Sequence, residues 1–322
     1  MVDHRPPENQ SPPAGPTPRR IVSLVPHATE LLFALGLGDR VVGVTHECDA
    51  PAAALALPQV TADQLPPGLS PAEIDRAVRE RTERGEAIYR LDEQRLADLD
   101  PDLIVTQELC PVCAVSFDEV AAVARELPRC PEVIALDPHT FGETLGDIRT
   151  LAGRCDVKDA GVDLVAEISR RADAVRIAVR GGERPRVVAV EWFDPVFTGG
   201  HWTPQLIEMA GGIDLCGLPG ERSETTTWDA IRALEPEIVV CIPCGYDADR
   251  SLAEATPFAQ QLWSTGARRV VTLDASAYFS RPGPRLVTGL ELLAHVLHPD
   301  RVPTPPDTVH EVARPTASAA RG

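Results

Sequence analysis

Two pairs of cysteines with the spacing Cys-x-x-Cys are the most reactive side chains in this sequence. Cys110 and Cys113 lie in "TQELCPVCAVS", and Cys241 and Cys244 lie in "IVVCIPCGYD". Thiolates at this spacing bind zinc when two pairs come together, and a single pair can act as a redox couple. Cysteine is also a common small buried residue. The residue types therefore leave a metal site, a redox pair and tightly packed loop residues as open interpretations.

The four cysteines differ in their positions relative to the predicted strands. Cys110, Cys113 and Cys244 follow segments that predict buried strands, whereas Cys241 lies inside such a segment and is expected to point into the core. Loops at the ends of strands are where α/β proteins gather their binding residues. We therefore take Cys110, Cys113 and Cys244 as candidate ligand contacts and candidate metal ligands.

Two histidines also follow segments that predict strands. His46, with Glu47 and Cys48, follows the predicted strand "RVVGVT", and a His-x-Cys pair at a strand end can bind a metal. His201 follows "FTGG", where glycines let the backbone approach a ligand closely. His201 is therefore the fourth candidate metal ligand, beside the three cysteines named above.

Aromatic residues are scarce, at 4% of the chain, but they cluster. One cluster lies within a single short segment: Trp192, Phe193, Phe197 and Trp202. Aromatic side chains on loops after strands favour a flat apolar ligand surface. Tyr278 lies close to Arg281, a cation that could pair with an anionic ligand group or with nearby acids.

Motifs of common catalytic sites do not occur in the sequence. It contains no G-x-G-x-x-G that opens a helix, no G-x-S-x-G and no H-E-x-x-H. We therefore expect no catalytic residues, and a binding protein rather than an enzyme.

The net charge of the chain limits the kinds of molecule that it is expected to bind. The 322 residues carry a formal net charge of −17, which disfavours binding to nucleic acid or to an anionic membrane surface. No apolar run approaches the roughly 20 residues of a membrane helix, so membrane insertion is not expected. Residues 1–20 are rich in proline and polar residues, and predict a disordered lead without an export signal. We expect a cytoplasmic protein with free thiols.

The order of apolar and amphipathic segments predicts the domain organisation. Apolar runs alternate with helical patterns over residues 21–139 and again over residues 183–300. Residues 140–182 have helical periodicity and no strand pattern, which predicts a connecting helix, either continuous or broken near residues 153–161. Residues 301–322 predict a disordered tail.

An internal repeat links the two alternating regions. Residues 99–102, "LDPD", and residues 234–237, "LEPE", each stand between a helical pattern and an apolar strand. The repeat predicts an α/β fold with two similar Rossmann-like lobes joined by a long helix. Ligands of parallel α/β sheets bind at the carboxyl ends of the strands, so we expect the site between the lobes.

Three segments resemble cobalamin-binding proteins of the ABC-transporter substrate-binding class. They are "IVSLVPHATELLFALGLGDRVVGVTHECDAP", "EWFDPVFTGGHWTPQLIEMAGG" and "DASAYFSRPGPRLVTGLELLA". The resemblance covers about residues 21–299. It implies the helical-backbone fold of class III periplasmic binding proteins, with two α/β lobes and a ligand cleft between them. It also implies a cobalamin, a related corrinoid or a related metal chelate as ligand, ABC importer components as possible partners, and a monomer.

The resemblance further implies that ligand contacts come from loops at strand ends. The corresponding residues here are His46, Glu47, Cys48, Gln107, Cys110, Cys113, Phe197, His201, Trp202, Tyr278 and Arg281. Cys244 joins them from its position after a strand. A cysteine-rich metal-binding or redox protein, with a thiolate site in the same cleft, remains the alternative.

Overall fold

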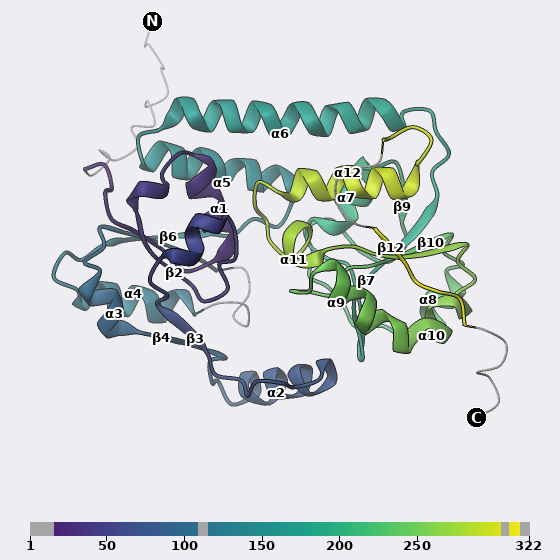
Figure 1. The fold of residues 1–322 in the computed structure, drawn as a ribbon, viewed down its shortest axis with the longest axis horizontal. Coiled ribbons are helices and arrows are strands. Elements are labelled where there is room, and N and C mark those ends of the chain that lie inside the picture. Colours follow the sequence, from purple (N-terminus) through teal and green to yellow (C-terminus); the bar gives the residue numbers. More distant parts are fainter. Residues whose placement is uncertain (1–15, 109–114, 304–308, 316–322) are drawn as a thin grey trace, which may run out of the picture.

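The first lobe is built on a parallel sheet. The computed structural model describes residues 16–108, 115–303 and 309–315 (Figure 1). The sheet has the order β2-β1-β5-β6, with all neighbours parallel. Its strands are β1 (Ile21–Ser23), β2 (Val41–Val44), β5 (Leu103–Gln107) and β6 (Glu132–Leu136). The helices of this lobe are α1 (Pro26–Ala34), α3 (Glu93–Asp98) and α4 (Phe117–Glu126), with the 3₁₀ turns η1 (Gly38–Arg40) and η2 (Ala52–Ala56).

The second lobe contains a larger, mixed sheet of order β12-β11-β10-β7-β8. Its central strands β7 (Arg186–Phe193), β10 (Ile238–Cys241) and β11 (Arg269–Thr272) are parallel. The antiparallel edge strands are β8 (Val196–Thr198) and β12 (His310–Glu311), and β9 (Ile213–Asp214) pairs with β7. The helical segments are α7 (Thr203–Met209), α8 (Trp228–Ala233), α9 (Ala248–Ala255), η3 (Thr256–Phe258), α10 (Ala259–Ser264), α11 (Ala275–Tyr278) and α12 (Leu286–Leu297).

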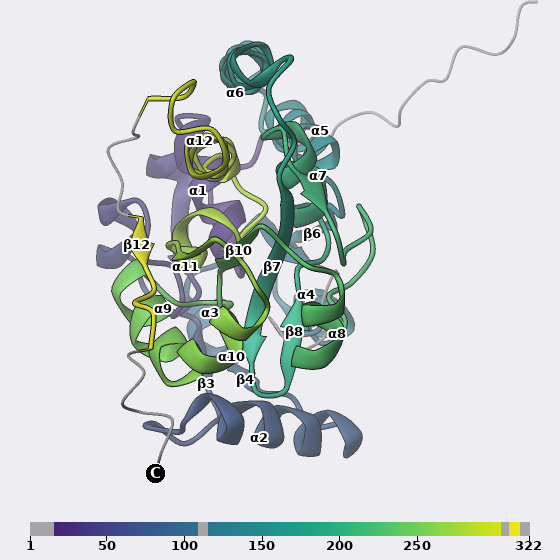
Figure 2. The ribbon, with the colours of Figure 1, turned by 90° about the vertical axis from the view of Figure 1, so that its right-hand side faces the viewer.

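Two helices connect the lobes. α5 (Phe141–Arg154) starts at a capping box formed by Thr140 and Glu143, and α6 (Lys158–Val179) follows after a short break at Cys155. The break falls within the region where the sequence placed a possible interruption. α6 runs along the top of both lobes and packs against α5 and α12 (Figures 1 and 2). The α/β fold of two lobes joined by long helices is thereby confirmed.

The internal repeat has the same hydrogen bonding in both lobes. In the first lobe the Asp102 carboxylate accepts the Arg20 backbone N–H at 3.0 Å, and the Arg20 guanidinium donates to the Asp100 carbonyl oxygen at 3.2 Å. In the second lobe the Glu237 carboxylate accepts the Arg186 backbone N–H at 2.9 Å, and the Arg186 guanidinium donates to the Glu235 carbonyl oxygen. The second acid of each repeat therefore ties the start of a central strand to the neighbouring strand.

Three segments differ from the sequence-based expectation. The proline-rich connection over residues 58–70 contains β3 (Thr61–Asp63), which pairs with β4 (Tyr89–Leu91) in a separate two-stranded sheet. Between them lies α2 (Pro71–Glu83), which begins at the expected cap Ser70 and lies at the bottom of the molecule in Figures 1 and 2. The region 301–322, expected to be disordered, includes strand β12. The described end of the N-terminal lead is also ordered, since the Arg19 backbone N–H donates to Asp102.

One apolar core runs through both lobes and the connecting helices. It joins residues such as Leu31 of α1, Ile148 of α5, Ile168 of α6 and Leu290 of α12. This shared core holds the two lobes together through the connecting helices. Within the described residues, none of the helices is both long and apolar enough to span a membrane.

Candidate functional site

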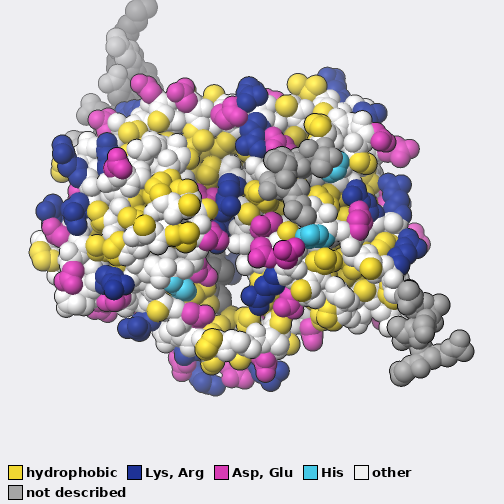
Figure 3. Space-filling view, in the orientation of Figure 1, with side chains coloured by type: hydrophobic (Ala, Val, Ile, Leu, Met, Phe, Trp, Pro, Cys, Tyr) yellow, Lys and Arg dark blue, Asp and Glu magenta, His cyan; other side chains and the backbone are white. Residues whose placement is uncertain are grey.

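The two lobes meet through loops that follow β2 and β6 in the first lobe and β8 and α11 in the second. The imidazole rings of His139, after β6, and His201, after β8, lie 6.2 Å apart. The Phe141 backbone N–H donates to the Gln205 side-chain oxygen at 2.8 Å. In the space-filling view, arginine and acidic side chains gather along the line between the lobes (Figure 3). We call the loops that meet here, with Asp49 and His139 of the first lobe and His201 and Arg281 of the second, the inter-lobe surface.

Arg281 lies in this surface and pairs with acids of the other lobe. Its guanidinium forms a two-pronged ion pair with the Asp49 carboxylate and donates to the Glu47 carbonyl oxygen at 3.2 Å. Its Nη1 also lies 3.6 Å from the Glu30 carboxylate. The Arg281 side chain is 14% exposed. Of the two roles that the sequence allowed for this cation, the structure shows the ion pair with nearby acids.

His46, Glu47 and Cys48 follow β2, but they face different surroundings. His46 and Glu47 are half-buried, and the Glu47 carboxylate accepts a hydrogen bond from the Tyr89 hydroxyl at 2.8 Å. Cys48 is buried in the apolar core, with its sulfur 3.0 Å from the Thr29 hydroxyl oxygen. Burial raises the pKa of the Cys48 thiol to about 11, which disfavours the thiolate that binds metals. The structure thus places Cys48 in the core rather than on the inter-lobe surface.

The structure describes only one of the two Cys-x-x-Cys pairs. Cys110 and Cys113 lie outside the described residues, while Gln107, at the end of β5, is buried. Cys241 points into the core of the second lobe, as expected from its place inside β10, and burial raises the pKa of its thiol. Cys244 is exposed, and its backbone N–H donates to the Glu191 carbonyl oxygen at 3.1 Å.

The aromatic residues close to His201 in the sequence divide into core residues and partly exposed residues. Trp202 is buried, and its indole N–H donates to the Phe279 carbonyl oxygen at 2.7 Å, so it supports the core. Phe193 is buried as well. Phe197 and Trp192 are half-buried and remain the available aromatic surface of this segment.

His201 and Tyr278 stay close to the inter-lobe surface. His201 is half-buried and adopts a positive φ of 52° between Gly200 and Trp202. Burial, followed by the neighbouring His139, lowers the pKa of His201, which keeps the imidazole neutral and able to bind a metal. Tyr278 is half-buried at the end of α11, with the Arg285 guanidinium 6.0 Å from its ring centre.

A metal site is not seen among the described residues. In residues 16–108, 115–303 and 309–315, three His, Cys, Asp or Glu side chains do not come together as a possible metal-binding group. His201 and Cys244 therefore do not belong to a group of three or more such side chains within this part of the chain. The predicted metal site of Cys110, Cys113, Cys244 and His201 stays a prediction, because two of its members lie outside it.

Sequence reasoning missed Glu191, a half-buried acid near the end of β7. Its carboxylate accepts hydrogen bonds from the Gly200 backbone N–H, the Thr203 hydroxyl and the Ser223 hydroxyl. Burial outweighs these hydrogen bonds and raises the pKa of Glu191 to about 7. Glu191 therefore holds the loop of His201 against the loop of Ser223. Its place after an apolar strand was the only signal in the sequence.

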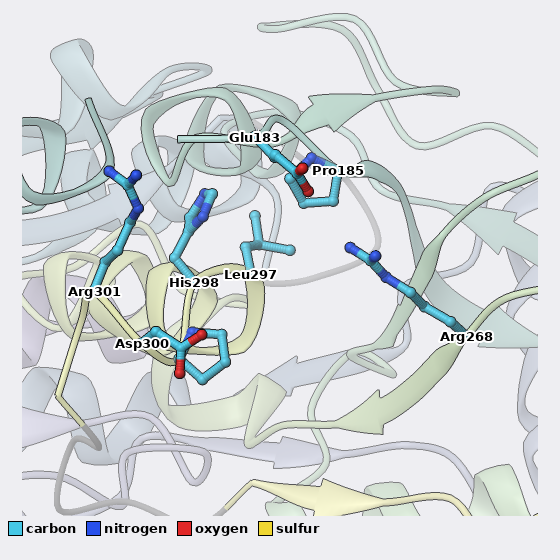
Figure 4. Close-up of a pocket in the computed structure, with 8 residues that line it drawn as sticks. Glu183, Pro185, Arg268, Leu297, His298, Asp300 and Arg301 are labelled. Carbon is cyan, nitrogen blue, oxygen red and sulfur yellow. The ribbon is translucent and has the colours of Figure 1, made fainter. Parts of the chain in front are cut away.

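Two depressions of the second lobe lie at the amino ends of its strands. A cavity of about 220 Å³ is lined by residues before β7 and β11 and after α12, among them Glu183, Arg268 and His298 (Figure 4). A second depression, of about 450 Å³, is lined by Arg186, Glu235 and other residues at the amino ends of the strands. Because ligands of parallel sheets bind at the carboxyl ends, these depressions are not the candidate site.

The fold and the inter-lobe surface define a substrate-binding protein of two lobes. Residues 21–277 match the family model of the periplasmic binding proteins, and the chain belongs to that family. The family is one of substrate-binding proteins.

Three individual proteins are similar to this chain over most of its length. The chain is 22% identical over 302 residues to a vitamin B12-binding protein of Vibrio cholerae, covering 86% of this chain and 89% of the relative. It is 25% identical over 299 residues to an uncharacterized ABC transporter substrate-binding lipoprotein of Bacillus subtilis, covering 88% and 81%. The crystal structure of a periplasmic heme-binding protein from Pseudomonas aeruginosa shares its fold with a TM-score of 0.68 and 21% identity, covering 93% and 99%.

Proposed function

We propose that this chain binds a corrinoid, or a related planar metal chelate, between its lobes. The observation that carries the proposal is the meeting of loops from both lobes at His139, His201, Arg281 and Asp49. The relatives named vitamin B12-binding and heme-binding proteins support a planar chelate as the ligand class.

The side chains of the inter-lobe surface suit a macrocycle with an apolar face and a polar rim. Phe197 and Trp192 offer half-buried aromatic faces, and His46, Glu47 and His201 offer polar groups. Burial of the macrocycle contributes roughly 25 cal/mol per Å² of apolar surface, less the cost of ordering the complex. A few polar groups then fix the orientation of the ligand.

Equilibrium dialysis of the purified, reduced chain against hydroxocobalamin and against hemin tests this proposal. We expect saturable binding of at least one of them with a one-to-one stoichiometry. Phe197→Ala weakens that binding, whereas Leu234→Ala, a matched loss of exposed apolar surface on the opposite edge of the sheet, leaves it unchanged. The proposal fails if neither chelate binds at tens of micromolar.

The resemblance to an ABC transporter substrate-binding lipoprotein supports importer components as the partners of the loaded chain. We propose that the chain acts as a monomer, which light scattering tests. A cytoplasmic location also stays a proposal, and fractionation of the source cells decides it. Metal analysis of chain purified without chelators tests the alternative of a thiolate metal site, which Cys110→Ser should abolish.

A further inference from the structure

Residues 61–91 form an arm that leaves the first lobe and returns to it. Strands β3 and β4 pair antiparallel as the stalk of this arm, and helix α2 lies at its end. Both ribbon views place α2 below the junction of the two lobes, on the side away from α6 (Figures 1 and 2). The arm therefore holds a helix beneath the line where the lobes meet.

Helix α2 is amphipathic, but it does not belong to the core of either lobe. None of its residues is buried. Ile74, Ala77 and Val78 lie on one face and are half-buried, whereas Arg76 and Glu80 are exposed. The apolar face therefore points toward the protein and still has surface left to bury.

Among the residues that the structure describes, the ion pairs of α2 stay within the arm. Arg79 pairs with Asp75 inside the helix at 2.9 Å, and Arg81 lies 3.7 Å from the Glu86 carboxylate, just beyond the helix. These pairs stabilise the helix itself and do not tie it to either lobe. The position of α2 thus depends on its stalk.

The turns at the two ends of α2 each contain a glycine in the left-handed region. Gly68 has a φ of 83° and Gly85 a φ of 69°, and neither has neighbouring atoms that a side chain would meet. Glycines with free space around them can absorb changes of backbone angle at low cost. The two turns are therefore suited to act as hinges between α2 and its stalk.

The stalk is anchored at the contact between the lobes. The Thr61 hydroxyl of β3 accepts the His46 backbone N–H at 3.1 Å, and the Tyr89 hydroxyl of β4 donates to the Glu47 carboxylate at 2.8 Å. The Glu47 carbonyl oxygen accepts a hydrogen bond from Arg281 of the second lobe at 3.2 Å. Both strands of the stalk are thus attached to the loop that meets the second lobe, and the arm is continuous with the inter-lobe surface.

The lobes themselves have little freedom to close around a ligand. One apolar core runs through both of them and the connecting helices, and Arg285 of the second lobe pairs with Glu30 of the first. A large ligand held between lobes of fixed separation keeps part of its surface in water. Burying that surface requires an element that moves independently of the lobes, and α2 meets this requirement.

We infer that the β3–α2–β4 arm is a lid that closes over the chelate bound between the lobes and brings Ile74 and Val78 against it. The inference rests on the proposed function and assigns to the arm the retention of the ligand. Contacts that form after the ligand has entered slow its release more than they change its rate of entry. The dissociation rate of the bound chelate is therefore the quantity that reports on the lid.

A shortened chain without the lid provides the first test. The stalk continues to Gln64 and Ile88, where the Gln64 N–H donates to the Ile88 carbonyl oxygen at 2.8 Å. An Asn-Gly turn in place of residues 65–87 therefore closes the hairpin and keeps Thr61 and Tyr89. Isotopically labelled hydroxocobalamin or hemin is bound, and its release is followed after addition of excess unlabelled chelate. We expect the shortened chain to bind with unchanged stoichiometry and to release the chelate about tenfold faster than the wild type.

A double variant of the complete chain provides the second test. Ile74→Ser with Val78→Ser removes the apolar face and keeps the arm, and it should speed release about fivefold, since part of the contact remains. Arg76→Ser with Glu80→Ser changes two exposed residues at the same spacing and should leave the rate unchanged. Urea denaturation confirms that each variant is folded.

The outcomes separate the lid from the proposed function. If the chelate binds but leaves the shortened chain and the Ile74 and Val78 double variant at the wild-type rate, the lid is overturned and the proposed function stands. Failure of both chelates to bind to the wild-type chain and to the shortened chain would overturn both.

Discussion

Glu30 of the first lobe and Arg285 of the second lobe form a two-pronged ion pair. The Arg285 Nε and Nη2 atoms donate to the two Glu30 carboxylate oxygens at 2.8 and 2.6 Å. Glu30 is 5% exposed, so its charge depends on this partner and on the more distant Arg281. The pair links α1 to Arg285, the residue immediately before α12.

Breaking this pair should destabilise the chain, because it leaves a buried carboxylate with weaker compensation. We expect Arg285→Ala to lower the free energy of unfolding by about 3 kcal/mol, measured by urea denaturation. Arg170→Ala removes an exposed ion pair with Glu167 on α6 and should cost about 0–1 kcal/mol. Equal losses in the two variants would contradict the structural role of the Glu30 pair.

Because His27 is buried, we expect the folded chain to lose stability in mild acid. It is buried beneath the 281–285 loop, and burial, followed by the positive charge of Arg281, lowers its pKa to about 3. The unfolded chain binds this proton below pH 6.5 and the folded chain does not, so stability falls as the pH decreases from 6.5 toward 3. The slope from this residue is about 1.4 kcal/mol per pH unit.

His27→Gln removes the titrating group and should flatten that slope. Urea denaturation at pH 5 and pH 7.5 measures it, and the difference in unfolding free energy between the two pH values should shrink by about 2 kcal/mol in the variant. Glu30, Asp49, Arg281 and Arg285 face the same region and are unchanged in both proteins. Equal slopes in the two proteins would show that His27 takes up its proton in the folded state.

Local patterns predicted the lobes, because their signals lie within short stretches of sequence. The repeated "LDPD" and "LEPE" segments each combine a helix end, a turn and a strand start, and the structure gives them the same hydrogen bonds. The capped start of α2 at Ser70 is equally local. Strands β8, β9 and β12 are too short to leave a pattern, and they form only by pairing with β7 or β11.

The details of the site depend on contacts between distant residues. Arg281 and Asp49 are 232 positions apart, so the sequence could offer both a ligand and an acid as the partner of Arg281 but could not choose. Burial of Cys48 and Trp202 is decided by Thr29 and Phe279, on other elements. The anchoring of His46 by Thr61 needs strand β3, which the proline-rich sequence did not predict.

For Glu191 we expect the free energy of unfolding to depend on pH in the opposite sense to that expected for His27. Because burial raises the pKa of Glu191 to about 7, the folded chain retains a proton that the unfolded chain releases above about pH 4.5. Stability from this residue therefore falls as the pH rises from 4.5 to 7, by roughly 1 kcal/mol per pH unit. Glu191→Gln keeps an oxygen acceptor and cannot ionise, so its stability relative to wild type should increase with pH. A constant difference across this range would contradict the raised pKa.

Phe197 and Trp202 should separate ligand binding from folding, although they lie five positions apart in the sequence. Phe197 is half-buried in β8, and Phe197→Ala should weaken chelate binding about five- to tenfold in dialysis with little effect on the urea midpoint. Trp202→Phe should do the reverse, because it leaves the Phe279 carbonyl oxygen without its indole donor and costs about 1–3 kcal/mol of stability. Affinity losses of similar size in both variants would show that the ligand reaches Trp202, and would move the aromatic surface of the site into what is now the core.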